Sequence, residues 1–250
     1  MQQSPLISVI TVVFQAEGLI ERTLKSVCGQ TLREKIEIVL VDGASKDRTV
    51  AMAKPFLQPT DVLISEPDKG IYDAMNKGLH AARGTFVIFI NAGDELFEAD
   101  TLERLLASGT DGDLYYGETA LVNDAGEVLG SRRLTPPKQL NRNSLRYGMC
   151  VSHQSILARR SLCPDYDTRY RISADIDWTI RLLERCKKTV YTEAFVSKFL
   201  LGGVSSARRK QGLIERWNIL SHHYGLMGNV LNHGWIALRF LIHRFTKKQH

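Results

Sequence analysis

The residues best suited to do chemistry stand together at positions 91–94, Asn-Ala-Gly-Asp. They follow the run 86–90, Phe-Val-Ile-Phe-Ile, which is typical of a strand buried on both faces. Asp94 is therefore expected at the carboxyl end of a strand, where open α/β sheets bind their ligands. A carboxylate there can hold a divalent cation whose other ligands are phosphate oxygens and water. It can equally begin the next helix, and this motif alone leaves both interpretations open.

Two more carboxylates, Asp175 and Asp177, stand where a second helix is predicted to start. Apolar residues at Ile180, Leu183 and Cys186 recur at helical spacing after them. Both acids thus fall at the electropositive N-terminal end of that helix, where negative charge is stabilised. Either of them could instead be a simple N-cap.

These groups need a scaffold, and the first hundred residues alternate strand and helix patterns. The runs that read as buried strands are 7–14, 36–41, 62–64 and 86–90. Helical patterns lie between them: one carries Leu24 and Val27, a short one has Ser45 as a plausible N-cap and is stopped by Pro55, and a third spans 71–83 with Gly84 as its C-cap. Strand, helix and strand in alternation predict right-handed parallel βαβ units, hence an α/β fold.

Further polar groups follow these strands. Asp42 ends the second strand, where it could accept hydrogen bonds from a base or ribose, although an Asp-Gly turn is the plainer interpretation. Asp68 and Lys69 precede the third helix, where backbone N–H groups suit a phosphate. The chain has no G-x-G-x-x-G after the first strand and no G-x-x-x-x-G-K-[ST], so neither a dinucleotide site nor a P-loop is indicated.

The pattern changes after Asp100, which begins a predicted helix with Glu103 as the partner of a capping box. Strand patterns at 114–116, 121–122 and 128–129, with a turn at 123–126, indicate a hairpin-rich half. His153 then precedes a predicted strand at 156–158. A lone histidine in such a place is more often structural than functional.

Composition sets the outer limits. The chain has 250 residues, 44% of them hydrophobic, with a formal charge of +6 and a pI near 9.2. That suits one large domain, or a domain with a small appendage, and it favours anionic partners. The four cysteines lie far apart, so neither a zinc site nor a disulfide framework is indicated and a cytoplasmic protein is expected. No signal peptide and no transmembrane stretch is evident.

The final segment is apolar with basic flanks. Its apolar residues share one helical face and its basic residues interrupt the others, which is typical of a helix lying in a membrane interface. A packing or dimer helix is the alternative. The apolar set is Trp235, Leu238, Leu241, Ile242 and Phe245, and the basic and histidine set is Arg239, His243, Arg244 and Lys247. We expect residues 1–203 to form the main domain, with halves at 1–98 and 99–203, and 204–250 to form a helical extension.

Taken together, these motifs resemble a known family. The segments 7–14, 26–31, 36–49, 66–78 and 91–94 match, in order, spacing and residue type, the inverting family 2 glycosyltransferases of bacterial polysaccharide biosynthesis, which have the GT-A fold. The resemblance is strong over about the first 100 residues and weaker around 153–155 and 175–177. It implies a Rossmann-like, mostly parallel nucleotide-binding sheet, a hairpin-containing acceptor half and a C-terminal helical extension.

The resemblance also implies roles. Phe14 falls where the family stacks an aromatic ring on the nucleotide base, and Asp42 where it hydrogen-bonds the base. The donor-binding set implied is Val12, Phe14, Asp42, Asp68, Lys69, Asn76 and Asn91. Asp94 matches the last acid of the metal-binding motif, with Mg or Mn as the ion, although the commoner pattern has acids where Asn91 and Gly93 stand.

In the acceptor half, His153 would line the active site and Asp175 would be the general base. Ala174 replaces the first acid of the family's Glu-Asp pair, so Asp177 remains the alternative base. The expected reaction is a hexosyl-type transfer, with inversion, from a nucleoside diphosphate sugar to a saccharide acceptor, free or lipid-linked, in cell-surface polysaccharide biosynthesis.

The expected protein works in the cytoplasm, with peripheral attachment to the inner face of the membrane as an option and no nucleic acid partner. A sugar-phosphate nucleotidyltransferase is the alternative enzyme. It would need a glycine- and arginine-rich loop after the first strand, and residues 15–18 are not one. A basic, non-catalytic protein binding membrane or nucleic acid is the alternative of another class, but its Lys and Arg are scattered rather than gathered in one stripe.

Overall fold

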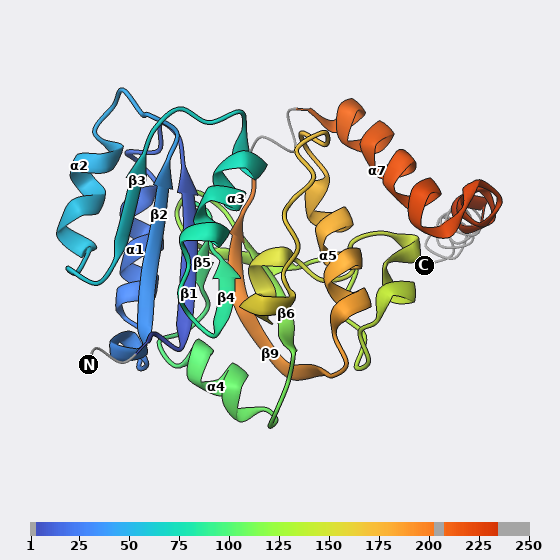
Figure 1. Cartoon of the computed structure of the whole chain (residues 1–250), viewed down its shortest axis with the longest axis horizontal. Coiled ribbons are helices and arrows are strands. Elements are labelled where there is room, and N and C mark those ends of the chain that lie inside the picture. The colour runs from blue at the N-terminus through green and yellow to red at the C-terminus, as the bar shows by residue number, and fades with distance from the viewer. Residues whose placement is uncertain (1–3, 203–207, 235–250) are drawn as a thin grey trace, which may run out of the picture.

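The computed structural model describes residues 4–202 and 208–234 and shows an α/β protein built on one sheet (Figure 1). The first half alternates strand and helix as expected. Its elements are β1 (Ile7–Val13), α1 (Ile20–Cys28), β2 (Ile36–Asp42), α2 (Thr49–Ala53), β3 (Val62–Ser65), α3 (Ile71–Ala81) and β4 (Phe86–Phe89), with short 3-10 turns at Arg33–Lys35 and Lys54–Phe56. The predicted βαβ organisation is confirmed.

The second half mixes short strands, helices and turns. Its elements are β5 (Glu95–Leu96), α4 (Thr101–Ala107), β6 (Leu114–Val122), β7 (Val128–Ser131), β8 (Ile156–Arg159), α5 (Ala174–Arg185), β9 (Thr189–Leu200) and α7 (Arg209–Tyr224), with 3-10 turns η3 (Arg142–Tyr147), η4 (His153–Ser155) and η5 (Arg160–Leu162). The chain is helical again over 226–234.

The sheet runs in the order β3-β2-β1-β4-β8-β6-β9-β5, with β7 paired to β6. The first four strands are all parallel to their neighbours, as the sequence predicts. Pairing becomes antiparallel from β4 to β8 and from β8 to β6, while β6 and β9 are parallel. The sheet therefore joins a parallel half to a mixed half at β4.

Strand residues alternate between two buried layers. In β1, Ile10 and Val12 pack with α3 and α5, whereas Ile7, Val9 and Val13 pack with α1 and α4. Because successive strand side chains point to opposite faces, a continuous apolar run is what a sheet covered on both sides requires. The parallel strands end at one edge of the sheet. Helix α5, which carries Asp175 at its N-terminus, belongs to the second half of the chain.

The helix ends differ from the sequence predictions in three places. Ser45 does not cap α2; its Oγ accepts a hydrogen bond from Gln15 N at 2.8 Å, and α2 begins at Thr49. Glu103 forms no capping box with Asp100, because its carboxylate accepts from the Thr31 hydroxyl at 2.7 Å. Helix α3 ends at Ala81, so Gly84 is not its C-cap. In all three, tertiary contacts outweigh the local signal.

The strand pattern of the second half was also incomplete. Residues 114–116 and 121–122 belong to one strand, β6, whose end forms the predicted hairpin with β7. The sequence analysis predicted no strand over 189–200, where the structure has β9, the twelve-residue strand that lies beside β6. Glu95 starts the short strand β5, not a helix.

Helix α7 packs on the main body. Ile219 and Leu220 are buried in the same apolar cluster as α5, so the predicted boundary at residue 203 falls between elements that share a core. No helix within 4–202 or 208–234 is long and apolar enough to cross a bilayer. The predicted interfacial segment, with Trp235, Leu238, Leu241, Ile242, Phe245, Arg239, His243, Arg244 and Lys247, lies outside the described residues.

Gly84, which does not cap α3, lies where its own backbone closely approaches the backbone of β1 at Ile7 and Ser8. A Cβ at this position would lie 2.6 Å from Ser8 N and 2.8 Å from the Ile7 carbonyl carbon. We expect Gly84→Ala to lower the free energy of unfolding by about 2 to 3 kcal/mol, because β1 and the segment before β4 cannot move apart without weakening the pairing of β1 with β4. Gly18→Ala is the matched control, since its Cβ would meet nothing within 4 Å. Equal thermal melting of the two variants would contradict this prediction.

Candidate active site

An exposed aromatic ring and a carboxylate flank the backbone beyond β2. Phe14 follows β1 and is 60% exposed. A Cβ at Gly43 would lie 3.2 Å from the Phe14 ring and 2.4 Å from Asp68 Oδ2, so both side chains lie directly against this glycine. A flat ring beside a carboxylate offers stacking and hydrogen bonding to a planar heterocycle.

Asp42 is close to this place but faces inward. It is fully buried, accepting from Ser45 N at 3.1 Å and from the Ser65 hydroxyl at 2.6 Å. These bonds shape the loop after β2. The partly exposed carboxylate beside Phe14 is Asp68, and the assignment of Asp42 to the base stays a prediction.

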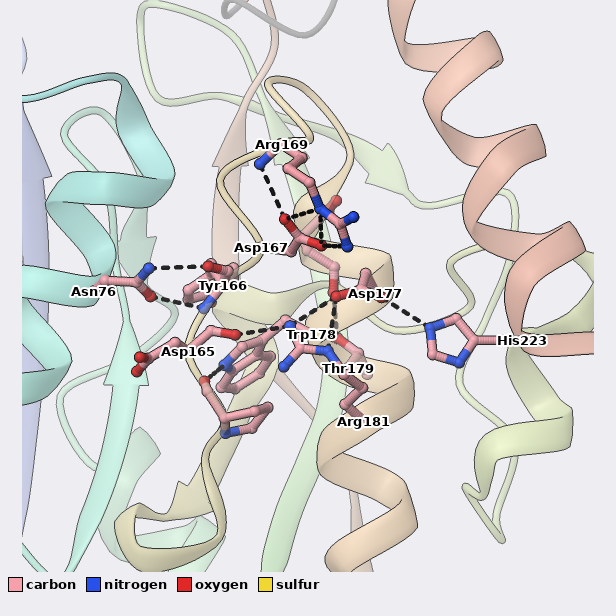
Figure 2. Close-up of polar contacts among 12 residues, drawn as sticks. Asn76, Asp165, Tyr166, Asp167, Arg169, Asp177, Trp178, Thr179, Arg181 and His223 are labelled. Atoms are coloured by element: carbon pink, nitrogen blue, oxygen red, sulfur yellow. Dashed lines mark hydrogen bonds and ion pairs between the residues drawn. The ribbon is translucent and has the colours of Figure 1, made fainter.

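Of three other predicted donor residues, Val12 and Asn76 have side chains that pack against or bond to the protein, whereas the Lys69 side chain is exposed. The Val12 side chain lies in the core, and its carbonyl accepts from Ala92 N at 3.4 Å. The Asn76 amide donates to Tyr166 O at 2.9 Å and accepts from Tyr166 N at 2.7 Å (Figure 2). Lys69 is exposed, and its carbonyl accepts from the Arg171 guanidinium at 2.7 Å. Lys69 alone of these three has a side chain open to a ligand.

Asp94 joins the two halves of the sheet. It is 5% exposed, and its oxygens accept from Leu200 N at 3.0 Å and from the Gln154 side chain at 2.8 Å. Burial, opposed by these bonds, raises the pKa of Asp94 to about 6. Asn91 is linked to it by a turn, Asp94 N donating to Asn91 O at 2.9 Å.

A divalent cation is the group that the acidic motif implies. Within the described residues, no three His, Cys, Asp or Glu side chains come together to hold one. The buried Asn91 Oδ1, however, has no hydrogen-bond partner among the described residues. Each Asp94 oxygen keeps a second lone pair. Asn91 Oδ1 and an Asp94 oxygen are hard donors of the kind that Mg²⁺ prefers, when its other ligands come from phosphate and water.

His153 and Asp175 form a pair at the start of α5. Their closest atoms, Nδ1 and Oδ2, are 3.8 Å apart, and the Asp175 side chain is 29% exposed. Burial raises the pKa of Asp175, but the contact and charge of His153 and the charge of Arg216 outweigh it, so the pKa falls below its ordinary value. His153 is 8% exposed, and its buried Nε2 has no partner in the described part of the chain.

Asp177 faces a different environment, although it is only two residues away. Its oxygens contact His223 Nε2 at 2.8 Å and the Arg181 guanidinium at 2.7 Å (Figure 2). Burial raises the pKa of Asp177, and the bonds to His223 and Arg181 more than offset this, so the pKa is lowered. The structure thus brings Asp175, and not Asp177, to His153.

Asp177 lines a separate cavity of about 480 Å³ between α5, α7 and the segment before α5. The other lining residues are Asp165, Tyr166, Asp167, Arg169, Tyr170, Arg181, His222 and His223. Its acids are matched by neighbouring bases, for example Arg169 on Asp167 at 2.6 Å. These ion pairs hold the cavity wall together.

Several residues of the site gave no sequence signal. Gln154 and Leu200 hold Asp94 from η4 and the end of β9. Arg171 contacts the Lys69 carbonyl, and Glu215 of α7 reaches the segment before α5. Each of these bonds spans at least 43 residues, so no local pattern could have revealed it.

A parallel sheet with polar groups at its carboxyl ends, joined to a mixed half that supplies a partly exposed carboxylate, is the arrangement in which open α/β sheets bind their ligands. The chain matches the model of glycosyl transferase family 2 over residues 8–166, more than half of its length. It therefore belongs to that family and is a glycosyltransferase, which decides against both alternatives raised by the sequence.

Individual relatives agree. A PGL/p-HBAD biosynthesis glycosyltransferase of Mycobacterium bovis is 32% identical over 224 residues, covering 85% of this chain and 84% of that protein. TarS 1-349 of S. aureus, solved with UDP-GlcNAc, has a TM-score of 0.66 at 17% identity, covering 86% of this chain and 65% of that one. This chain thus spans less than two thirds of that structure.

The mannosyltransferase PcManGT of Pyrobaculum calidifontis, solved with GDP-Man and Mn2+, has a TM-score of 0.60 at 19% identity, covering 94% of this chain and 76% of that one. These structural likenesses confirm the predicted GT-A type of fold.

The ion pairs of Asp177 generate a pH-dependent prediction. Because its folded pKa lies below the unfolded value of about 4, its stabilisation is complete above that pH and is lost as the pH falls through the folded pKa. We expect Asp177→Asn to lower the free energy of unfolding at pH 7 by about 2 to 4 kcal/mol, since His223 and Arg181 lose a charged partner.

The measurement is urea unfolding of wild type and variant from pH 7 down to pH 3. The difference between them should shrink as the pH falls. Asp111→Asn, on an exposed turn, is the control and should change little. A difference that is constant with pH would show that the charge of Asp177 contributes nothing.

Proposed function

We propose that this glycosyltransferase moves a hexosyl group from a nucleoside diphosphate sugar to an acceptor hydroxyl in one step, with inversion. The observation that carries the proposal is Asp175, a half-open carboxylate of lowered pKa at the N-terminus of α5, paired with His153. Nucleotide sugars bound to the TarS and PcManGT structures support the donor class.

Different residues of the chain bind different parts of the donor. The Phe14 ring stacks on the base, and the Asp68 carboxylate beside Gly43 accepts a hydrogen bond from it. The exposed Lys69 side chain, one residue on, brings a positive charge to the diphosphate. Asn91 and Asp94 lie past the end of β4, where they would hold a Mg or Mn ion. Such an ion, when bound, neutralises charge on the departing diphosphate.

Asp175 performs the proton transfer. Its lowered pKa keeps it ionised at neutral pH, so it is ready to accept a proton. As the acceptor oxygen bonds to the anomeric carbon, its proton passes to Asp175 and the bond to the diphosphate oxygen breaks on the opposite face. A single displacement of this kind inverts the anomeric configuration. His153 lines the acceptor side and orients the carboxylate.

The acceptor we propose is a saccharide or glycolipid used in cell-surface biosynthesis, reached from the cytoplasm. The name of the mycobacterial relative, which refers to PGL/p-HBAD biosynthesis, supports a lipid-linked acceptor. The exposed Leu226, Met227, Val230 and Leu231 on the helical stretch after α7 favour peripheral contact with a membrane. The positive formal charge of +6 suits an anionic surface.

The base assignment is tested by Asp175→Asn. The amide cannot accept the acceptor proton, so kcat should fall about 100-fold or more while the dissociation constant of the donor, measured by calorimetry, stays near the wild-type value. Asp177→Asn, assayed at a temperature where it is folded, should lose far less. The reverse ranking of these two variants would move the base to Asp177.

The metal role is tested by Asp94→Asn. We expect weaker donor binding with Mg²⁺ or Mn²⁺ and unchanged binding in chelator, because the neutral amide cannot balance the ion's charge. Gln154→Ala is the matched control, since it removes a hydrogen bond to Asp94 and keeps the carboxylate. If both variants only lower the melting temperature and leave metal dependence intact, Asp94 ties the sheet together and holds no ion.

A further inference from the structure

A buried glutamate of α7 reaches the backbone just before α5. Glu215 Oε1 accepts from Arg171 N at 3.0 Å, while Oε2 accepts from Ile172 N at 2.8 Å and Ser173 N at 3.0 Å. Glu215 is 8% exposed, and its only further hydrogen bond in the described residues comes from Gln211 at 2.9 Å. Three consecutive N–H groups therefore share one carboxylate.

This contact holds the backbone that leads into α5, up to its N-cap residue. Ser173 is the N-cap residue of α5, but its side chain makes no capping bond and donates instead to Gly212 O of α7 at 3.1 Å. The first N–H groups of a helix need acceptors, and the helix dipole favours a negative one. Charge-assisted bonds to backbone N–H are also stronger than neutral ones. Of the three bonded groups only Ser173 N, at the N-cap, belongs to α5; Arg171 N and Ile172 N precede it, so Glu215 holds the segment that leads into the helix from 42 to 44 residues away.

The position of the proposed base depends on this contact. Asp175 is the second residue of α5, two positions after Ser173, so its carboxylate is placed by the same backbone that Glu215 holds. The Tyr72 hydroxyl of α3 fixes the segment from the other side by donating to Ile172 O at 2.9 Å. The backbone before Asp175 thus lies between α3 and α7.

A second bond ties the same two helices. His223 of α7 contacts Asp177 of α5 at 2.8 Å (Figure 2). This bond joins a side chain to a side chain and leaves the backbone of 171–173 untouched. It provides a natural comparison, because its loss loosens α7 without removing the acceptor for those N–H groups.

We propose that Glu215 is a positioning residue for catalysis: its charge fixes the N–H groups of 171–173 and so aims Asp175 at the acceptor hydroxyl. The inference rests on the proposed role of Asp175 as base. The matched family region ends at residue 166, so α5 and α7 both lie beyond it. Helix α7 is by this account part of the catalytic apparatus of the chain.

The test compares Glu215→Gln, Glu215→Asp and His223→Gln in the full-length protein. Glu215→Gln should lower kcat about 10- to 100-fold, because a small displacement of a reacting group has that effect, with the calorimetric donor affinity unchanged. Glu215→Asp keeps the charge on a shorter side chain, so its kcat should lie between wild type and Glu215→Gln. His223→Gln should lower the melting temperature but leave kcat near wild type.

The outcomes separate the inference from the function beneath it. A folded Glu215→Gln with wild-type kcat, or a loss of kcat that only parallels melting temperature across the three variants, overturns the positioning role. Should Glu215→Gln not fold, wild-type kcat in Glu215→Asp overturns it equally. If Asp175→Asn itself keeps wild-type turnover, it is the proposed base that fails.

Discussion

The buried carboxylate of Asp94 connects the parts of this enzyme. It follows β4, at the seam where the parallel half of the sheet meets the mixed half, and it accepts one bond from η4 and one from the end of β9. Burial raises its pKa to about 6, so the fold tolerates a costly group at this seam. The tie places Asn91 and the carboxyl end of β4 next to the segment that carries His153.

The acceptor side depends on an equally remote contact. Ser173, the N-cap residue of α5, makes no side-chain capping bond, and Glu215 holds the backbone N–H groups of 171–173 that lead into the helix. His153 pairs with Asp175 from η4, and η4 is also the source of Gln154, which bonds Asp94. Donor end, base and C-terminal helix are therefore linked through a few buried polar groups, two of which, His153 and Gln154, belong to η4.

The sequence predicts the parallel half well because its signals are local. Short runs rich in β-branched residues, such as Ile7–Val13, favour strands covered on both sides, and the helical patterns between them favour right-handed parallel connections. Asp94 was singled out by its place after a strand, Asp68 by its place before a helix, and Phe14 by the family resemblance alone. The sequence could not show in which direction each side chain points. Asp42, Asp68 and Asp94 are all aspartates, yet Asp42 and Asp94 are buried while Asp68 is partly exposed.

The second half was harder for a physical reason. Its elements pair over long separations. Strand β9, although rich in β-branched and aromatic residues, was not predicted, and the contact of Glu215 with 171–173 leaves no local signal. The two carboxylates of α5 illustrate this limit. Asp175 and Asp177 are indistinguishable by helix position, and only tertiary partners, His153 for one and His223 with Arg181 for the other, give them different environments.

The reaction we propose is a single displacement assisted by one carboxylate base. The most direct measurement is the anomeric configuration of the product, read from the proton coupling constant by NMR after transfer from an α-linked nucleoside diphosphate sugar to a simple acceptor. A single displacement should give a β-linked product, in which the anomeric configuration is inverted. An α-linked product would require a different mechanism and would contradict it.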